Sequence, residues 1–372
     1  ISLEGVSLPK QLELPESQGR LAEEFLESLR SDPEAFRALS SDERCDAYRR
    51  HGASIGDGVR LGERAIVIAS RVVLEDGVEI GDEGFVQCDE VFAVGALTSF
   101  GPRLDVQCRR VFIGVNGYFG RDVRIGGGGR RDPWATLAVG DLVFVGDESF
   151  INPCRPVVIG REVFVTMRSM LVTHNIGHSV LEGFENRFAP IVLEDRAQVG
   201  LGTVVYAGCR LGREAIVASN SYVVSDIPAG QLAIGVPAKA VGVSARPVPR
   251  GRQPQLVRRM LDDFRELLEL RGVDVAAGSD HSVAVRVDGK TSLVLFVEKV
   301  SATFEPPETD GEVVVLTLDA AGEPQAGCAV LDLVARRVYG EGGVVLDSVR
   351  ELCRKRGIRL ETGPWRYRSG LI

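Results

Sequence analysis

A chain of 372 residues with 44% hydrophobic and 26% charged side chains has the composition of a folded globular protein rather than of a disordered or fibrous one. Its formal net charge of −8 argues against bulk electrostatic binding to nucleic acid or to an anionic membrane, because both need a positive surface. No apolar run reaches the ~20 residues of a membrane span, and residues 1–18 lack the apolar stretch of a signal peptide.

The chain contains seven cysteines, an odd number, and no pair has Cys-x-x-Cys spacing. This usage predicts free and mostly buried thiols in a reducing cytoplasm. A cysteine nucleophile is the minor alternative, because an isolated cysteine is more often a packing residue. We therefore expect a cytoplasmic protein without structural disulfides.

Helical patterns occupy residues 16–52. Residues 31–34 combine capping side chains with a proline at the first helical position, and Ser40 with Glu43 fits a capping box. Gly52 would end the last of these helices. We expect the helices to cover the open first turn of the domain that follows, which would otherwise expose a sheet edge.

The next part of the chain carries a six-residue repeat. Every sixth residue is aliphatic in the clearest run, which is Leu193, Val199, Val205, Leu211, Val217 and Val223. A period of six is neither that of a helix nor that of a simple strand. It indicates a parallel β-helix, in which three short strands close one triangular turn of about 18 residues and the aliphatic side chains stack inside. A β-sandwich of short strands is the alternative, although its strands do not hold such a phase.

Two long interruptions fall within the repeats. Residues 126–138 contain four consecutive glycines followed by two arginines and an aspartate. A phosphate-binding loop would be followed by a helix and by Lys-Ser/Thr, and both are missing, so this segment is predicted to be a loop extruded from a corner. Residues 175–190 form the second interruption and are also predicted to be a loop.

The repeat ends before a linker at residues 243–254, which a helix over 255–271 follows. Strand patterns at 282–287, 292–297, 312–318 and 328–334 and a helix at 344–356 then predict a smaller α+β domain. We expect four segments: an N-terminal helical segment (1–52), the β-helix (53–242), a linker with a helix (243–272), and a C-terminal α+β domain of unknown role (273–372).

Residues 139–242 resemble the hexapeptide-repeat acyltransferase family, in particular its galactoside, maltose and nodulation-factor O-acetyltransferases. The residues that carry the resemblance are Thr173-His174, the loop 175–190, Val199-Gly200, Asp226-Ile227-Pro228 and Gly235-Val236-Pro237-Ala238-Lys239. The resemblance covers roughly a third of the chain well and does not extend beyond about residue 272. It implies a mainly β protein built on a left-handed parallel β-helix, and usually a homotrimer with active sites between neighbouring subunits.

The resemblance also assigns site residues. It implies that His174 is the general base that removes the proton from an attacking hydroxyl or amine, a task that suits an imidazole with a reference pKa of ~6.5. Asn152 matches the acceptor-binding position one turn earlier, and His178 and Glu185 in the loop are further candidates for contact with the acceptor. The positions implied to bind coenzyme A are Gly202, Ser221, Pro237, Ala238 and Lys239.

The function predicted on this basis is transfer of an acetyl or other short acyl group from coenzyme A to a sugar, amino sugar or natural product. An acyl carrier protein is an alternative donor. No metal is expected, because a zinc site of the related β-helical hydrases needs three histidines, and His51 and His281 lie outside the repeats. The competing hypotheses are a non-catalytic β-helical scaffold and a metal-dependent hydrase.

Overall fold

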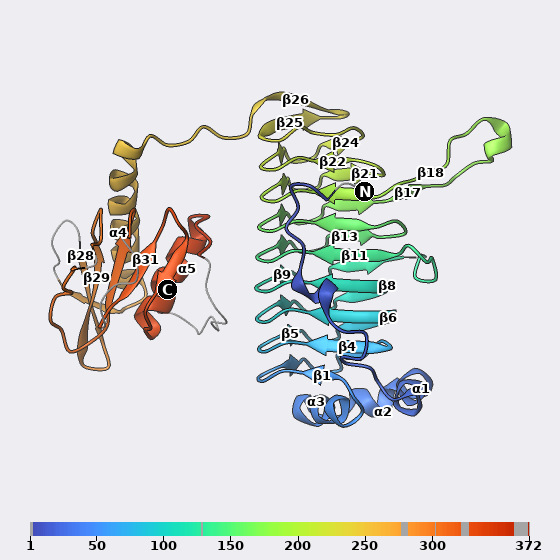
Figure 1. Ribbon diagram of the computed structural model, residues 1–372, viewed down its shortest axis with the longest axis horizontal. Coiled ribbons are helices and arrows are strands. Elements are labelled where there is room, and N and C mark those ends of the chain that lie inside the picture. The colour runs from blue at the N-terminus through green and yellow to red at the C-terminus, as the bar shows by residue number, and fades with distance from the viewer. Residues whose placement is uncertain are drawn as a thin grey trace. The chain divides into compact units, whose positions relative to one another are not determined.

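The computed structural model describes residues 3–127, 129–276, 282–301, 303–320, 327–360 and Leu371 (Figure 1). The chain divides into two compact units, Ile1–Arg246 and Pro247–Ile372. The first unit is mainly β and contains a parallel β-helix, and the second combines a sheet with helices, as predicted. None of the helices within these ranges offers an apolar stretch that could reach across a lipid bilayer.

The β-helix of the first unit has three flat faces, and its strands pair in parallel from coil to coil. The first face consists of β1 (Ser54–Ile55), β4 (Arg71–Leu74), the second halves of β6 (Phe85–Val94) and β8 (Asp105–Ile113), β11 (Thr136–Val139), β14 (Val157–Ile159), β19 (Ile191–Leu193) and β22 (Arg210–Leu211). The second face consists of β2 (Arg60–Leu61), β5 (Glu79–Ile80), β7 (Ser99–Phe100), β9 (Tyr118–Phe119), β12 (Phe144–Val145), β15 (Phe164–Val165), β20 (Gln198–Val199) and β23 (Ile216–Val217). The third face consists of β3 (Ile66–Ile68), the first halves of β6 and β8, β10 (Arg124–Gly126), β13 (Phe150–Asn152), β16 (Met170–Val172), β21 (Val204–Tyr206) and β24 (Tyr222–Val223).

The six-residue repeat marks the inside of this prism. The aliphatic residues of the run from Leu193 to Val223 are all 0% exposed, and they belong to one continuous apolar core. Removing each such side chain from water contributes about 1.5–3 kcal/mol to folding. The six-residue interpretation of the sequence is therefore confirmed. An antiparallel pair, β25 (Gln231–Gly235) and β26 (Ala238–Val243), follows the last coil, and β25 pairs with β23.

The three corners of the prism differ in backbone conformation. Two corners turn, coil after coil, through a residue with positive φ, as at Leu142, Glu162 and Arg196 on one corner and at Glu148 and Arg168 on the other. The third corner connects the third face to the first. Both insertions leave the prism at this corner, residues 129–135 between β10 and β11 and residues 173–190 between β16 and β19.

Helices close the first coil, as the sequence predicted. They are α1 (Glu23–Ser31), α2 (Pro33–Arg37) and α3 (Ser41–Arg50), and α3 begins with the predicted capping box of Ser40 and Glu43. Two fully buried side chains of α3 bond to the backbone of the open coil. The Arg44 guanidinium donates to the carbonyls of Leu61, Gly62 and Ala65 at 2.5–3.0 Å, and the Tyr48 hydroxyl donates to Val67 O and accepts from Val67 N at 2.6 and 2.9 Å.

The prediction of helix over residues 16–22 was wrong. The backbone there is extended, because Leu21 N donates to Ser70 O and Arg20 forms an antiparallel bridge with Arg71. These bonds to the first coil satisfy the backbone groups that a helix would have satisfied internally. The first helix therefore begins only at Glu23.

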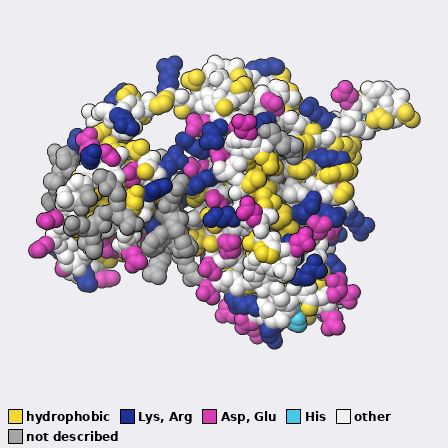
Figure 2. All heavy atoms as spheres, viewed as in Figure 1, with side chains coloured by type: hydrophobic (Ala, Val, Ile, Leu, Met, Phe, Trp, Pro, Cys, Tyr) yellow, Lys and Arg dark blue, Asp and Glu magenta, His cyan; other side chains and the backbone are white. Residues whose placement is uncertain are grey.

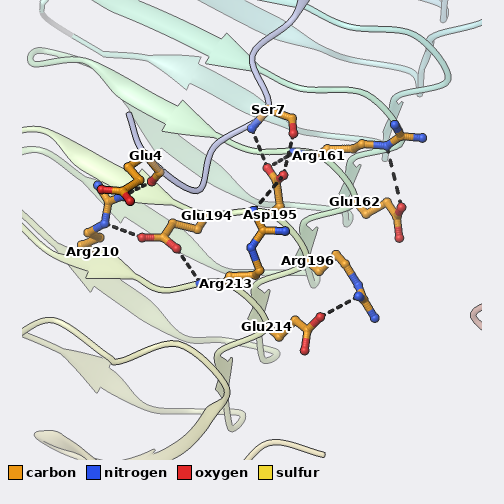
Figure 3. A network of polar contacts seen from close by, with 10 residues as sticks. All are labelled: Glu4, Ser7, Arg161, Glu162, Glu194, Asp195, Arg196, Arg210, Arg213 and Glu214. Carbon is orange, nitrogen blue, oxygen red and sulfur yellow. Dashed lines mark hydrogen bonds and ion pairs between the residues drawn. The ribbon is translucent and has the colours of Figure 1, made fainter. Parts of the chain in front are cut away.

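Residues 3–18, here called the strap, cross the outer side of the first face and include the short helix η1 (Lys10–Glu13) (Figure 1). At one end the buried Asp195 carboxylate accepts from Ser7 N and Ser7 Oγ at 2.7 and 2.6 Å, and from Arg161 N at 3.0 Å (Figure 3). Further along, Gln11 donates to Glu75 at 2.8 Å. The strap thereby covers outward apolar residues of this face, which are Val73, Val91, Ala93 and Phe112, with Leu14 packed against them.

The second unit is a six-stranded mixed sheet in the order β27 (Asp274–Ala276), β28 (Ser282–Val287), β29 (Lys290–Phe296), β30 (Val313–Thr317), β31 (Ala329–Asp332) and β32 (Arg337–Tyr339). The pairs β29–β30 and β30–β31 are parallel and the others are antiparallel. Helices α4 (Gln253–Leu270) and α5 (Val344–Lys355) share one apolar core with this sheet. The helix that follows the linker is thus part of the second unit.

All seven cysteines are free and buried. Burial raises the pKa of Cys108 and Cys209 to about 11, and that of Cys353 to about 12. A thiol with a pKa near 11 is ionised in about one molecule in a thousand at pH 8, and only the thiolate is nucleophilic. We therefore expect slow labelling by Ellman's reagent in the native protein at pH 8 and seven fast thiols in guanidinium chloride. A native thiol that reacts at the rate of free cysteine would contradict this expectation.

Candidate active site

His174 lies where the chain leaves the third corner. It is the first residue of β17 (His174–Asn175), which pairs antiparallel with β18 (Arg187–Phe188) at the base of the second insertion. The side chain is half-buried. Its Nδ1 atom is buried and has no hydrogen-bond partner among the described residues, whereas Nε2 is not buried. Nε2 is therefore the nitrogen that can meet a substrate.

Phe188 lies opposite His174 in this short hairpin. It is the cross-strand partner of His174, and the two rings stack with centroids 5.5 Å apart and planes 13° from parallel. The side chain of Phe188 is 41% exposed, so the stack lies at the protein surface. The imidazole is held by this ring contact rather than by a hydrogen bond.

Asn152 lies one coil below, next to the residue that precedes His174. It is 4% exposed, its carbonyl accepts from Thr173 Oγ1 at 2.7 Å, and its side-chain oxygen accepts from Cys154 N at 3.3 Å. Its Nδ2 group has no hydrogen-bond partner in the described part of the chain. The structure thus brings Asn152 and His174 to the same corner, with an amide nitrogen available as a donor.

Arg155 connects the two insertions at this corner. Its backbone N donates to Thr173 Oγ1 at 3.1 Å, and its guanidinium lies 4.4 Å from the ring centroid of Trp134 and 5.0 Å from that of Phe188. It also forms an ion pair with Asp132 at 2.8 Å. Trp134 and Asp132 belong to the first insertion and Phe188 to the second, so side chains of both insertions meet on one arginine.

The rest of the second insertion projects from the prism as an arm (Figure 1). The ring of His178 contacts that of Phe184 with centroids 4.5 Å apart and planes tilted by 38°, and neither His178 nor Glu185 has a hydrogen bond or ring contact with His174. The arm exposes several apolar side chains, which are Ile176 (58%), Val180 (59%), Leu181 (94%) and Phe184 (50%). Figure 2 shows hydrophobic side chains at the tip of the arm. Within a single chain the arm therefore has an uncovered apolar surface.

The candidate coenzyme A residues lie at a different corner, between the second and third faces. Gly202 has φ +66° and occupies the same turn position as Arg168 and Asn220 in adjacent coils, and a Cβ on it would lie 2.6 Å from Asn220 Oδ1. Ser221 is 2% exposed and its hydroxyl accepts from Gly235 N at 3.1 Å. Both residues therefore have a structural role in shaping this corner.

The motif Gly235-Val236-Pro237-Ala238-Lys239 forms the turn between β25 and β26, and its Val236-Pro237 bond is cis. Ala238 is buried, whereas Pro237 and Lys239 are exposed beside the last coil. The hydrogen bond that Gly235 N donates to Ser221 Oγ joins this turn to the corner of Gly202. Within one chain, the third face thus separates the cofactor candidates from His174.

No protein-family model matches this chain. Among curated proteins, the 2,3,4,5-tetrahydropyridine-2,6-dicarboxylate N-acetyltransferase of Staphylococcus aureus (strain JH9) is 40% identical over 53 residues, which are 14% of this chain and 22% of that protein. The chain thus spans about a fifth of the length of the curated relatives it matches.

Among solved structures, a hexapeptide-repeat-containing acetyltransferase from Vibrio cholerae is 20% identical, with 64% of this chain and 99% of that chain covered and a TM-score of 0.28. A galactoside acetyltransferase in complex with coenzyme A is also 20% identical, with 37% and 65% covered and a TM-score of 0.26. Hexapeptide-repeat acetyltransferases are thus what this chain resembles. Likeness at this level concerns the fold alone, so the chemistry has to be inferred from the side chains.

In the described ranges, no group of three or more His, Cys, Asp or Glu side chains is arranged to hold a metal ion. His51 lies at the far end of the unit, where its ring stacks on Phe25 with centroids 4.2 Å apart. His281, which was considered as a metal ligand, lies outside the described residues.

Sequence reasoning missed three residues of the corner: Trp134, Arg155 and Phe188. Nothing in the sequence showed that the glycine-rich insertion reaches the second insertion. The sequence features that could have drawn attention to these three residues are an aromatic residue near the end of each insertion and an arginine at the corner between them.

Proposed function

We propose that this protein is a coenzyme-A-dependent acyltransferase that transfers an acetyl or other short acyl group to a hydroxyl or amine of a sugar, amino sugar or natural product. The observation that carries the proposal is the position of His174, a half-buried imidazole with Nε2 accessible and Nδ1 buried, beside the acceptor candidate Asn152. A thioester is already activated, so the acceptor needs only to lose its proton as it attacks, and a general base near neutral pH suffices.

In this reaction Nε2 of His174 takes the proton of the acceptor group while the acceptor oxygen or nitrogen forms a bond to the thioester carbon. The tetrahedral intermediate then collapses, the carbon–sulfur bond breaks, and the thiolate of coenzyme A leaves with the proton from the imidazole. A backbone N–H close to His174 would stabilise the oxyanion. Asn152 Nδ2 would donate a hydrogen bond to an oxygen of the acceptor.

The protein is further proposed to act as a homotrimer. Monomeric surfaces rarely leave large contiguous apolar patches uncovered, and the arm presents four exposed apolar side chains, of which Leu181 is 94% exposed. A neighbouring subunit would cover the arm and bring its own cofactor corner close to His174, which one chain alone does not do. The seven free thiols support a reducing compartment such as the cytoplasm.

A calorimetric titration of the full chain with acetyl-coenzyme A tests the proposal. We expect saturable binding of one molecule per chain and release of free thiol when a panel of hexoses and amino sugars is added. Lys239→Ala should weaken binding by at most about tenfold, because an exposed ion pair is worth ~1 kcal/mol or less. Lys290→Ala, an exposed lysine of the second unit, is the matched control. Absence of binding would favour the scaffold hypothesis, or an acyl carrier protein as donor if the carrier thioester supports transfer.

A further inference from the structure

The imidazole of His174 lacks the partner that usually orients a catalytic base. In most such sites a carboxylate or a carbonyl accepts from the second ring nitrogen and fixes the ring. Here Nδ1 is buried and unpaired among the described residues, so packing alone sets the orientation of the ring. The packing partner is Phe188, whose ring is nearly parallel to the imidazole.

Phe188 in turn contacts Arg155, which is bound by residues of the first insertion. The guanidinium of Arg155 lies 5.0 Å from the Phe188 centroid and 4.4 Å from the Trp134 centroid, and both distances are within the range of about 6 Å for a cation–π contact. Trp134, Arg155, Phe188 and His174 thus form one continuous series of ring and guanidinium contacts. A planar guanidinium suits such a position because it stacks on flat rings, which an ammonium cannot do.

The first insertion is built to keep Arg155 in this place. The Asp132 carboxylate binds the Arg155 guanidinium at 2.8 Å through one oxygen and accepts from Trp134 N at 3.1 Å through the other. The loop is tied to the previous coil, where Arg110 donates to Pro133 O at 2.8 Å. Gly129 packs so closely on the next corner that a Cβ there would lie 2.4 Å from Cys154 Sγ. These contacts fix the conformation of the loop against the prism.

We propose that the loop of residues 129–135 is part of the active site and positions the catalytic base. Trp134 and Asp132 hold Arg155 against Phe188, and Phe188 holds the imidazole of His174 in line with the acceptor. These are positioning residues, because none of them needs to touch the reacting atoms. The proposal rests on the proposed role of His174 as base, and it gives the glycine-rich insertion a function that its sequence did not indicate.

The orientation of the imidazole can be measured without a substrate. The chain has four histidines, so the ring signals of His174 can be assigned in a carbon–proton correlation spectrum by comparison with His174→Ala. Stacking on Phe188 gives these signals a ring-current shift. We expect Trp134→Ala to move the His174 signals toward their unstacked positions, and Arg131→Ala to leave them unchanged. Arg131 is an exposed residue of the same loop that has no described contact.

Turnover gives the second measurement. With the acceptor identified by the panel, Trp134→Ala should lower kcat by about tenfold or more, because small misplacements of a reacting group cost up to ~10²-fold in rate. The KM for acetyl-coenzyme A should not change. Trp134→Phe keeps a flat ring and should restore most of kcat, whereas Arg155→Lys keeps the charge, loses the stacking surface and should not. If Trp134→Ala does not fold, Asp132→Asn tests the same contact.

The outcomes separate this inference from the function on which it rests. Activity that survives in His174→Ala would refute the base itself. An inactive His174→Ala together with unchanged kcat and unchanged His174 signals in Trp134→Ala would refute the positioning role alone. A rise in the acceptor KM with unchanged His174 signals would also overturn it, since Trp134 would then bind the acceptor instead.

Discussion

Replacing His174 by Ala lowers the kcat of acyl transfer by about 10²–10⁴-fold, the usual contribution of a positioned general base. Without the imidazole the acceptor keeps its proton as it attacks, so it is too weak a nucleophile at neutral pH. Steady-state kinetics measured by thiol release give the change in kcat. Calorimetry with acetyl-coenzyme A should give nearly the same affinity as for the unchanged protein, since a general base acts on the proton of the acceptor and is not needed to hold the cofactor.

A matched variant makes this result specific. Asn175→Ala alters the next residue of β17, whose side chain is exposed and makes no described contact, and it should turn over normally. Added imidazole should partly restore the activity of His174→Ala, because the cavity left by the side chain can accept a free base. Wild-type turnover by His174→Ala, or loss of cofactor binding in it, would mean that the residue is not the base.

Replacing Arg44 by Met lowers the free energy of unfolding by about 3 kcal/mol, because the buried carbonyls of Leu61 and Ala65 lose their donor and each unpaired group costs about 1–3 kcal/mol. The carbonyl of Gly62 keeps its bond from Ala65 N. The corresponding fall in Tm is about 6–12 °C for a domain of this size. Thermal denaturation followed by circular dichroism measures the fall. Arg50→Met, on the exposed side of the same helix, should change Tm little.

The same coil gives a smaller, independent test. Tyr48→Phe removes a hydroxyl that both donates to and accepts from Val67, so one backbone N–H and one C=O become unpaired in the apolar core. A Tm equal to that of the wild type in both variants would show that water or another group can close the first coil. In that case α3 would shield the sheet edge by its bulk alone.

The sequence was sufficient to predict those parts of the fold that depend on local patterns. The inward column from Leu193 to Val223 repeats within each coil, and the capping box of Ser40 and Glu43 lies within four residues. Such features need no knowledge of distant contacts. The strap could not be predicted in this way, because its partners Asp195 and Glu75 are distant in the sequence and residues 3–18 carry no periodic pattern.

The candidate site was predictable only in part, for the same reason. His174 and Asn152 occupy positions that the repeat and the family motif define. Arg155, Trp134 and Phe188 come together because two insertions leave the same corner two coils apart, and the length and folding of an insertion follow no repeat. The sequence therefore indicated no role for the glycine-rich loop, although the loop contacts residues around His174.

The strap also constrains the order in which this unit can assemble. Ser7 and Asp195 are 188 positions apart, so the strap has no complete docking surface until the coil that carries Asp195 has been wound. The strap is synthesised early but can bind to the prism only late. Until then the apolar residues on the outer side of the first face are exposed to solvent. Contacts of such long range slow folding. Proteolysis during refolding should therefore cut the strap after the coils have become resistant.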